Sequence, residues 1–231
     1  MNICGYQKTT LLDYPGHVAA TIFTGGCNFR CPFCHNSDLL AKPDRSLLIS
    51  EEEIFSFLKK RKNVLSGICI TGGEPTLQPD LGDFILKVRN LGYKIKLDTN
   101  GYRPEAIASL LEQNLLDYIA MDIKSGFSNY EAVSGLSNLN MNKIRESIAL
   151  IENSNIAYEF RTTVVQELHK EQDFQEISEM LSPKSSYYIQ SFKDSGNILT
   201  TGLSSCDTET LNHYLSIIKK KFSNASLRGI E

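Results

Sequence analysis

Residues 67–98, GICITGGEPTLQPDLGDFILKVRNLGYKIKLD, contain the repeating unit that decides the fold. The apolar run at 67–71 predicts a buried strand, and 81–91 predicts a helix that stops at Gly92. A second strand is predicted over 93–98. A strand, a helix and another strand in this order form the unit from which parallel sheets are built.

The same alternation extends along the chain in both directions. Further strands are predicted over 17–24, 118–123, 157–165 and 187–192, and further helices over 51–61, 104–113, 141–153, 174–181 and 208–222. Six strand–helix units predict an α/β fold, either an open doubly wound sheet or a barrel. A complete eight-unit barrel needs about 250 residues, so we expect a partial (β/α)6 TIM-like barrel of parallel strands. No linker-like stretch interrupts residues 1–231, which predicts one domain with its chemistry at the carboxyl ends of the strands.

The overall composition argues against nucleic acid and membrane as partners. The 231 residues are 41% hydrophobic and carry a formal net charge of -3 without clustered Lys and Arg, so we expect no nucleic-acid partner. The longest uncharged apolar runs are far shorter than the roughly 20 residues that span a bilayer, and the N-terminal stretch lacks an apolar signal-peptide core. We therefore expect a cytoplasmic protein with no membrane partner.

Six cysteines, at positions 4, 27, 31, 34, 69 and 206, stand out from this average composition. In a reducing compartment, clustered cysteines indicate metal ligands rather than disulfides. Cys27, Cys31 and Cys34 lie in GGCNFRCPFCHN, directly after the first predicted strand. Iron–sulfur cubanes are held by Cys thiolates, and three ligands would leave one of the four irons open, as in catalytic metal sites. The alternative is a zinc site completed by His35 or a distant cysteine.

Two further strand ends carry small or polar residues. TGGEP at 71–75 follows the second strand, where Gly72 and Gly73 let a backbone approach a ligand closely and Glu74 can accept hydrogen bonds from an ammonium group. On its own, this motif is equally typical of a turn, and Asn100-Gly101 after the third strand is an ordinary turn signal.

Asp98 and Asp122 lie at the ends of apolar strands, where a carboxylate is costly unless it is paired or bound to a cation. Together with Thr99 and a backbone carbonyl, the two carboxylates would suit a hard cation. The alternative is a set of ordinary surface ion pairs, Asp122–Lys124 and Arg161–Glu159. Residues two apart on a strand share a face, so these side chains could equally line a cavity.

The spacing Cys-x-x-x-Cys-x-aromatic-Cys, with Phe33 at the aromatic position, resembles the radical S-adenosylmethionine (SAM) enzymes. In that family the open iron binds the amino and carboxylate groups of SAM, and one electron from the reduced cluster cleaves SAM to a 5'-deoxyadenosyl radical. The resemblance implies a radical SAM core with two cofactors, SAM and one [4Fe-4S] cluster held by Cys27, Cys31 and Cys34.

The resemblance also implies roles for the strand-end residues. The family's GGE segment, which contacts the SAM amino group, matches Gly72, Gly73 and Glu74. In the glycyl-radical-enzyme activases, a monovalent cation beside the SAM carboxylate is held at positions that match Asp98, Thr99 and Asp122. Basic positions near the SAM ribose and carboxylate match Lys124 and Arg161, and a backbone segment near adenine matches His35 and Asn36.

The stretch QKTTLLDYPG at 7–16, running into FTGGCNFRCPFCHN, resembles the longer type of anaerobic ribonucleoside-triphosphate reductase activating proteins. QSFK at 190–193 departs from the Pro-Tyr-His segment of pyruvate formate-lyase activating enzymes. The resemblance implies an oxidoreductase that installs a glycyl radical on that reductase, with an electron donor such as flavodoxin or ferredoxin. The alternatives are activation of another glycyl-radical enzyme of the pyruvate formate-lyase type, radical chemistry on a small molecule, and a zinc-stabilised binding module.

Overall fold

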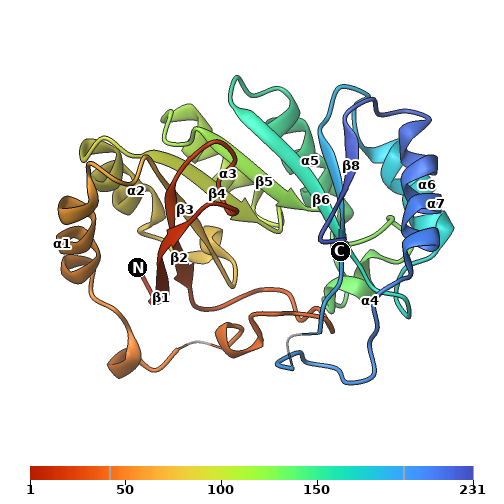
Figure 1. The fold of residues 1–231 in the computed structure, drawn as a ribbon, viewed down its shortest axis with the longest axis horizontal. Helices are drawn as coiled ribbons and strands as arrows, with labels where there is room; N and C mark the ends of the chain where they lie inside the picture. The colour runs from red at the N-terminus through yellow and green to blue at the C-terminus, as the bar shows by residue number, and fades with distance from the viewer. Residues whose placement is uncertain (42, 195, 231) are drawn as a thin grey trace.

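The computed structural model describes residues 1–41, 43–194 and 196–230, which are built around one curved sheet of eight strands in the order β1 to β8 (Figure 1). Seven strands pair in parallel: β2 (Ala19–Thr24), β3 (Gly67–Gly72), β4 (Lys94–Thr99), β5 (Tyr118–Asp122), β6 (Ala157–Val164), β7 (Tyr187–Ser191) and β8 (Ala225–Arg228). The edge strand β1 (Ile3–Thr10) runs antiparallel to β2. The prediction of a partial barrel of parallel strands is confirmed.

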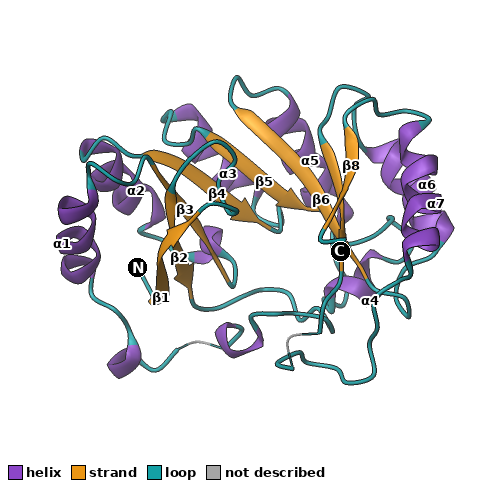
Figure 2. Ribbon diagram, in the orientation of Figure 1, coloured by secondary structure: helices purple, strands orange, loops and turns teal. Residues whose placement is uncertain are grey.

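Helices cover the outer side of the curved sheet (Figure 2). They are α1 (Glu51–Arg61), α2 (Leu81–Asn90), α3 (Pro104–Glu112), α4 (Tyr130–Ser134), α5 (Met141–Glu152), α6 (Glu171–Met180) and α7 (Thr208–Lys219). Short 3-10 turns lie at Ser37–Leu39, Arg45–Leu47 and Pro75–Leu77. In the described part of the chain, no helix is both long and apolar enough to cross a bilayer.

The six predicted strand–helix units are present, and two strands that were not predicted extend the sheet. The parallel strand β8 follows α7 at one edge, and β1 lies at the other edge. The short helix α4 was not predicted either. These additions leave the six predicted strands and their helices in place, with boundaries shifted by a few residues.

The inner and outer faces of the sheet differ in polarity, because helices cover only the outside. In β4, Ile95 and Leu97 belong to the apolar core, whereas Lys96 and Asp98 alternate with them and pair with each other on the opposite face. The inner face of the partial barrel is therefore polar, and its polar residues continue to the strand ends, where the predicted site residues lie.

Tyr14, in the turn between β1 and β2, packs against the amino-terminal ends of the strands. Its ring is only 2% exposed and lies 5.9 Å from the ring of Tyr118 on β5. A Cβ added at Gly67 would lie 2.7 Å from the Tyr14 ring, so this approach requires glycine at the start of β3. Tyr14 thus packs at the end of the barrel opposite the site.

Candidate active site

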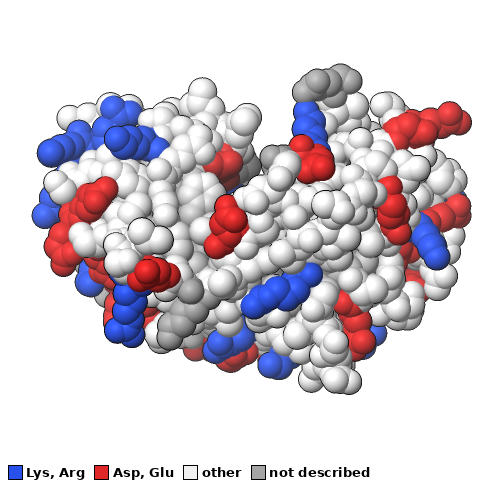
Figure 3. Space-filling model, turned by 90° about the horizontal axis from the view of Figure 1, so that it is seen from below, with Lys and Arg blue, Asp and Glu red and all other residues white. Residues whose placement is uncertain are grey.

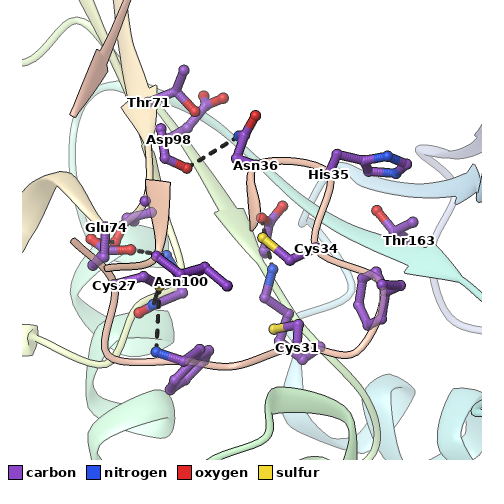
Figure 4. Close-up of a pocket in the computed structure, with 18 of the residues that line it drawn as sticks. Cys27, Cys31, Cys34, His35, Asn36, Thr71, Glu74, Asp98, Asn100 and Thr163 are labelled. Atoms are coloured by element: carbon purple, nitrogen blue, oxygen red, sulfur yellow. Dashed lines mark hydrogen bonds and ion pairs between the residues drawn. The ribbon is translucent and has the colours of Figure 1, made fainter. Parts of the chain in front are cut away.

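A cavity at the carboxyl ends of the strands encloses about 770 Å³, counting its open mouth (Figure 4). Its walls bring together every residue that the sequence predicted for the site: Cys27, Cys31, Phe33, Cys34, His35, Asn36, Gly72, Gly73, Glu74, Asp98, Thr99, Asp122, Lys124 and Arg161. Five residues that were not predicted also line it: Phe29, Leu40, Thr71, Asn100 and Thr163.

The three clustered cysteines face this cavity from one loop, residues 25–36. Cys27 lies on one side, and Cys31 and Cys34 lie on the other (Figure 4). None of the three is in a disulfide. Burial raises the pKa of Cys27 to about 12 and that of Cys31 to about 11. Binding iron to these sulfurs must therefore displace their protons.

An unpaired polar atom beside the cysteine loop tests whether these residues fit an iron–sulfur cluster. Among the described residues, Asn28 Nδ2 is buried without a hydrogen-bond partner, and Asn28 follows Cys27 in the chain. A buried donor without a partner costs about 1–3 kcal/mol, and cluster sulfurs accept hydrogen bonds. Three free thiols that line one cavity, with this free donor beside them, fit a [4Fe-4S] cluster.

The zinc alternative needed His35 or a distant cysteine as a further ligand. The His35 ring instead packs against Phe192, with the ring centroids 5.4 Å apart, and points away from the three thiols (Figure 4). Among the residues that the structure describes, no three His, Cys, Asp or Glu side chains are placed to hold a single metal ion.

Backbone hydrogen bonds connect the cysteine loop to several other parts of the chain. They include Gly26 N to Leu39 O at 2.7 Å, Glu74 N to Gly26 O at 2.8 Å, Arg30 N to Ser134 O at 2.9 Å and Thr200 N to Pro32 O at 3.0 Å. The loop is therefore positioned by the protein backbone on every side, including by the end of α4, which the sequence did not predict.

Gly72 and Gly73 are needed for the fit between two strand ends. Gly72 has φ +115°, and a Cβ there would lie 2.4 Å from the backbone of Thr24. A Cβ on Gly73 would lie 2.2 Å from the carbonyl oxygen of Gly26. We expected the glycines to admit a ligand; the close approach in the structure is to the chain's own backbone at residues 24–26. The side-chain amide of Asn36 also donates to the Gly72 carbonyl, at 3.2 Å.

Glu74 is a buried carboxylate held by uncharged donors. It is 1% exposed and accepts from Thr76 N at 3.1 Å, Thr76 Oγ1 at 2.5 Å, Thr99 Oγ1 at 2.8 Å and Asn100 N at 2.7 Å. Burial raises its pKa despite these hydrogen bonds. Glu74 thus joins the ends of β3 and β4, and among the described residues all the donors that it receives are neutral.

A different arrangement surrounds Asp98 and Asp122, which belong to an alternating row of charges: Lys96, Asp98, Arg161, Asp122 and Lys124. We call this row the charged chain. Lys96 Nζ donates to one oxygen of Asp98, and Arg161 Nη2 donates to the other at 3.0 Å. Arg161 Nε donates to Asp122 Oδ1 at 2.5 Å, and Lys124 Nζ donates to Asp122 Oδ2 at 3.0 Å. Each of the four carboxylate oxygens therefore has its own cationic donor.

The electrostatics of the charged chain follow from this pairing. Burial opposes ionisation of Asp98 and Asp122, but Arg161 and the two lysines outweigh it and hold the pKa of both carboxyls below the usual range. Burial also disfavours the charged form of Lys124, but the attraction of Asp122 is larger and raises the pKa of the Lys124 amine. Asp98 and Asp122 are therefore ionised at neutral pH, and Lys124 and Arg161 keep their positive charges.

The predicted cation ligands do not fit a bound metal cation. The carboxylate oxygens of Asp98 and Asp122 are already occupied by charged donors. The Thr99 hydroxyl is turned to Glu74. The surface-pair alternative is also wrong for Asp122 and Lys124, which pair with each other but line the cavity.

Two of the residues that sequence reasoning missed explain how the walls are connected. Asn100, interpreted only as a turn residue, donates from its amide to Asn28 Oδ1 at 2.8 Å and lies 3.9 Å from the Cys27 sulfur. Lys96 was overlooked, although its position two residues before Asp98 on the same strand was a usable signal. Thr71 and Thr163 sit at the ends of β3 and β6 and carried no signal of their own.

Comparison with known proteins agrees with this geometry. The family model described as the radical SAM superfamily matches residues 21–182. MJ1227 of Methanocaldococcus jannaschii, named as a candidate glycyl-radical enzyme activating enzyme, is 33% identical over 234 residues, covering 99% of this chain and 96% of that protein.

Solved structures of low sequence identity share the fold. Streptococcus suis SuiB bound to the precursor peptide SuiA has a TM-score of 0.66 at 15% identity, covering 91% of this chain and 48% of SuiB. QueE from Escherichia coli has a TM-score of 0.58 at 14% identity, covering 99% of this chain and 93% of QueE. The chain therefore belongs to the radical SAM superfamily and is an enzyme of that superfamily, a membership that implies a [4Fe-4S] cluster and SAM as cofactors.

Proposed function

We propose that this enzyme is a cytoplasmic activase that installs a glycyl radical on the anaerobic ribonucleoside-triphosphate reductase. The observation that carries the proposal is the match to MJ1227, which extends over nearly the whole length of both chains. The choice of the reductase rests on the sequence at 7–16 and its continuation into the cysteine loop.

Opposite charges on two walls of the cavity suit the amino-acid part of SAM. Lys96, Arg161 and Lys124 carry three positive charges against the two carboxylates of the charged chain, which leaves one positive charge for the SAM carboxylate. Glu74, held only by neutral donors among the described residues, would supply a negative charge for the SAM ammonium group. In this arrangement the protein orients SAM, and the bound cluster supplies the electron that cleaves it.

The proposed reaction balances with one electron from an external donor such as flavodoxin or ferredoxin. That electron breaks the bond between sulfur and the 5' carbon of SAM and releases methionine. The resulting 5'-deoxyadenosyl radical removes one hydrogen atom from the α carbon of a glycine on the partner. The products are 5'-deoxyadenosine and a glycyl radical.

The face that would receive the partner is the one at which the parallel strands end. The middle of that face is mostly uncharged surface (Figure 3). Cys34 and Asn36 are only partly buried there, so the cavity can be reached from outside. A glycine-bearing loop of another polypeptide is the kind of substrate that this surface would admit.

The test is direct. The cluster-loaded enzyme is incubated without oxygen with SAM, a reductant and the anaerobic ribonucleoside-triphosphate reductase, and the glycine-centred doublet is measured by electron paramagnetic resonance. We expect the doublet with the reductase and not with a variant whose radical-bearing glycine is alanine. A doublet only with pyruvate formate-lyase would move the assignment to that enzyme.

The remaining alternatives predict other outcomes. Accumulation of 5'-deoxyadenosine with a metabolite, and no doublet with any glycyl-radical enzyme, would establish small-molecule chemistry. One equivalent of zinc without iron or sulfide, in protein purified without oxygen, would favour the zinc-stabilised binding module over an enzyme.

A further inference from the structure

Lys96 is a buried lysine that enters the activity outlined above only through its charge, because its ammonium group pairs with Asp98. It lies on the inner face of β4 and is 1% exposed. Its ammonium group contacts Asp98, lies 3.8 Å from the Cys69 sulfur and lies 5.9 Å from the centre of the Tyr118 ring. Lysine is almost never fully buried unless it is paired, so this position needs an explanation.

Among the described residues, Asp98 is the one carboxylate within ion-pair distance of Lys96, which also lies near the Cys69 sulfur and the Tyr118 ring. Cys69 and Tyr118 flank it on the neighbouring strands β3 and β5, in register with it. Lys96 therefore forms its ion pair with Asp98. Asp98 in turn holds Arg161 at 3.0 Å, which links Lys96 to the middle of the charged chain.

A monovalent cation at this place would meet two obstacles. The carboxylate oxygens of Asp98 and Asp122 are each occupied by an ammonium or guanidinium group. The charged chain also already carries an excess of one positive charge, so an added cation would be repelled. Removing Lys96 would reverse both conditions, because it would free one oxygen of Asp98 and neutralise the excess.

We propose that the ammonium group of Lys96 takes the place of a bound monovalent cation, so that this enzyme binds and cleaves SAM without sodium or potassium ions. Lys96 is a positioning residue: it fixes Asp98, which fixes Arg161 toward the SAM carboxylate. The inference rests on SAM binding in the cavity and is independent of which polypeptide is activated.

The experiment compares the wild type with Lys96→Met and with the control Lys94→Met. Lys94 lies two residues earlier on β4, but its side chain is 58% exposed and pairs with Asp117. Formation of 5'-deoxyadenosine by the cluster-loaded enzyme is measured without a partner protein, using a europium(II) reductant that is free of sodium and potassium. Choline, sodium and potassium chloride are compared at one ionic strength of about 0.15 M, so that screening is constant.

We expect the wild type and Lys94→Met to cleave SAM at the same rate in all three salts, within about twofold. Loss of a buried ion-pair partner should lower the rate of Lys96→Met in choline by about tenfold or more, with partial recovery in sodium or potassium. The dissociation constant for SAM and the melting temperature of the same cluster-loaded proteins should show the same salt pattern. A purely structural role would lower stability equally in all three salts.

Two results would overturn the proposal. One is activation of the wild type by sodium or potassium of more than about fivefold over choline, measured at that constant ionic strength. The other is a folded Lys96→Met variant that cleaves SAM in choline at the wild-type rate. If Lys96→Met does not fold, the double variant Lys96→Met, Asp98→Asn removes both buried charges, and we expect it to fold and to bind SAM weakly in all three salts. Tight, cation-dependent binding by that variant would also contradict the proposal.

Discussion

The buried carboxylate Glu74 and the partly buried pair Asp98 and Asp122 lie around one cavity, but their surroundings are opposite in charge. Neutral hydroxyl and backbone N–H groups hold Glu74, and its pKa is raised. Ammonium and guanidinium groups hold the two aspartates, and their pKa values are lowered. The difference shows that burial alone does not set the direction of a carboxylate's pKa shift, because the charge of its hydrogen-bond donors also matters. Under the proposed function, the SAM ammonium group would lie by Glu74 and the SAM carboxylate by the charged chain.

The largest expected effect comes from removing the cluster that would lie between these two regions. Cys31→Ala should abolish the intact cluster, because a [4Fe-4S] cluster is held by its thiolates. Cys69→Ala is the matched control, since Cys69 is a buried thiol outside the cavity, and it should cost only about 1 kcal/mol of packing. Iron and sulfide content per chain measures both. A full cluster and unchanged activity in Cys31→Ala would show that the assignment of Cys31 as a ligand is wrong.

Arg161→Met breaks the charged chain at its centre and leaves two buried carboxylates without their shared partner. We expect a loss of about 3–5 kcal/mol, seen as a fall in melting temperature of about 10 °C or more, together with loss of SAM binding. The control is Arg89→Met, which removes a pair with Asp117 whose arginine is 31% exposed, and which should cost about 1 kcal/mol or less. Equal losses of stability in Arg161→Met and Arg89→Met would mean that the charged chain is no more important for stability than the exposed pair of Arg89 and Asp117.

Glu74→Gln tests the other region. Replacing one carboxylate oxygen by an amide nitrogen leaves a buried donor such as Asn100 N without an acceptor, at a cost of about 1–3 kcal/mol. Loss of the negative charge should also weaken SAM binding by about tenfold, as measured by equilibrium dialysis. Glu105→Gln, in an exposed pair with Arg103, is the control and should change neither quantity. Unchanged SAM affinity in Glu74→Gln would remove Glu74 from ammonium recognition.

The dependence of stability on pH should have opposite signs in the two regions. Glu74 has a raised pKa, so its contribution is fully present at low pH and is lost as the pH rises above about 4.3 through that raised value. Asp98 has a lowered pKa, so its contribution is present above about pH 3.9 and is lost as the pH falls toward the lowered value.

Melting temperatures of the wild type, Glu74→Gln and Asp98→Asn across pH measure these slopes. The advantage of the wild type should shrink with rising pH relative to Glu74→Gln and grow relative to Asp98→Asn, each by at most about 1.4 kcal/mol per pH unit. Slopes of the same sign in the two comparisons would contradict the contrast drawn above.

Regular features of the fold could be predicted from the sequence because their signals are local. Helix α1 begins and ends where expected, since Ser50 accepts a hydrogen bond from Glu53 N at 3.2 Å and basic residues fill the last turn. The edge strand β1 has exposed and half-buried residues without clean alternation, and β8 and α4 have only four and five residues. Such elements depend on their neighbours in space and leave little periodicity to detect.

For the site, the sequence predicted which residues meet but not how they are paired. All predicted residues line one cavity, because the ends of parallel strands meet at one edge of the sheet. Alternation in β4 shows that Lys96 and Asp98 share a face, but it does not show that this face is enclosed by the barrel. The occupation of the aspartate oxygens by Lys96 and Arg161 depends on strand curvature and register, which no local pattern encodes.

The hydrogen bonds that fix the cysteine loop have a consequence for the life of the protein in a cell. They join backbone groups at Leu39, Glu74, Ser134 and Thr200 to residues of the loop, so none of them needs a cluster atom as donor or acceptor. An exposure to air would then cost the cell iron and sulfide while sparing the protein. The loop would keep its conformation, and a repair system could then rebuild the cluster on the same three cysteines without new protein synthesis.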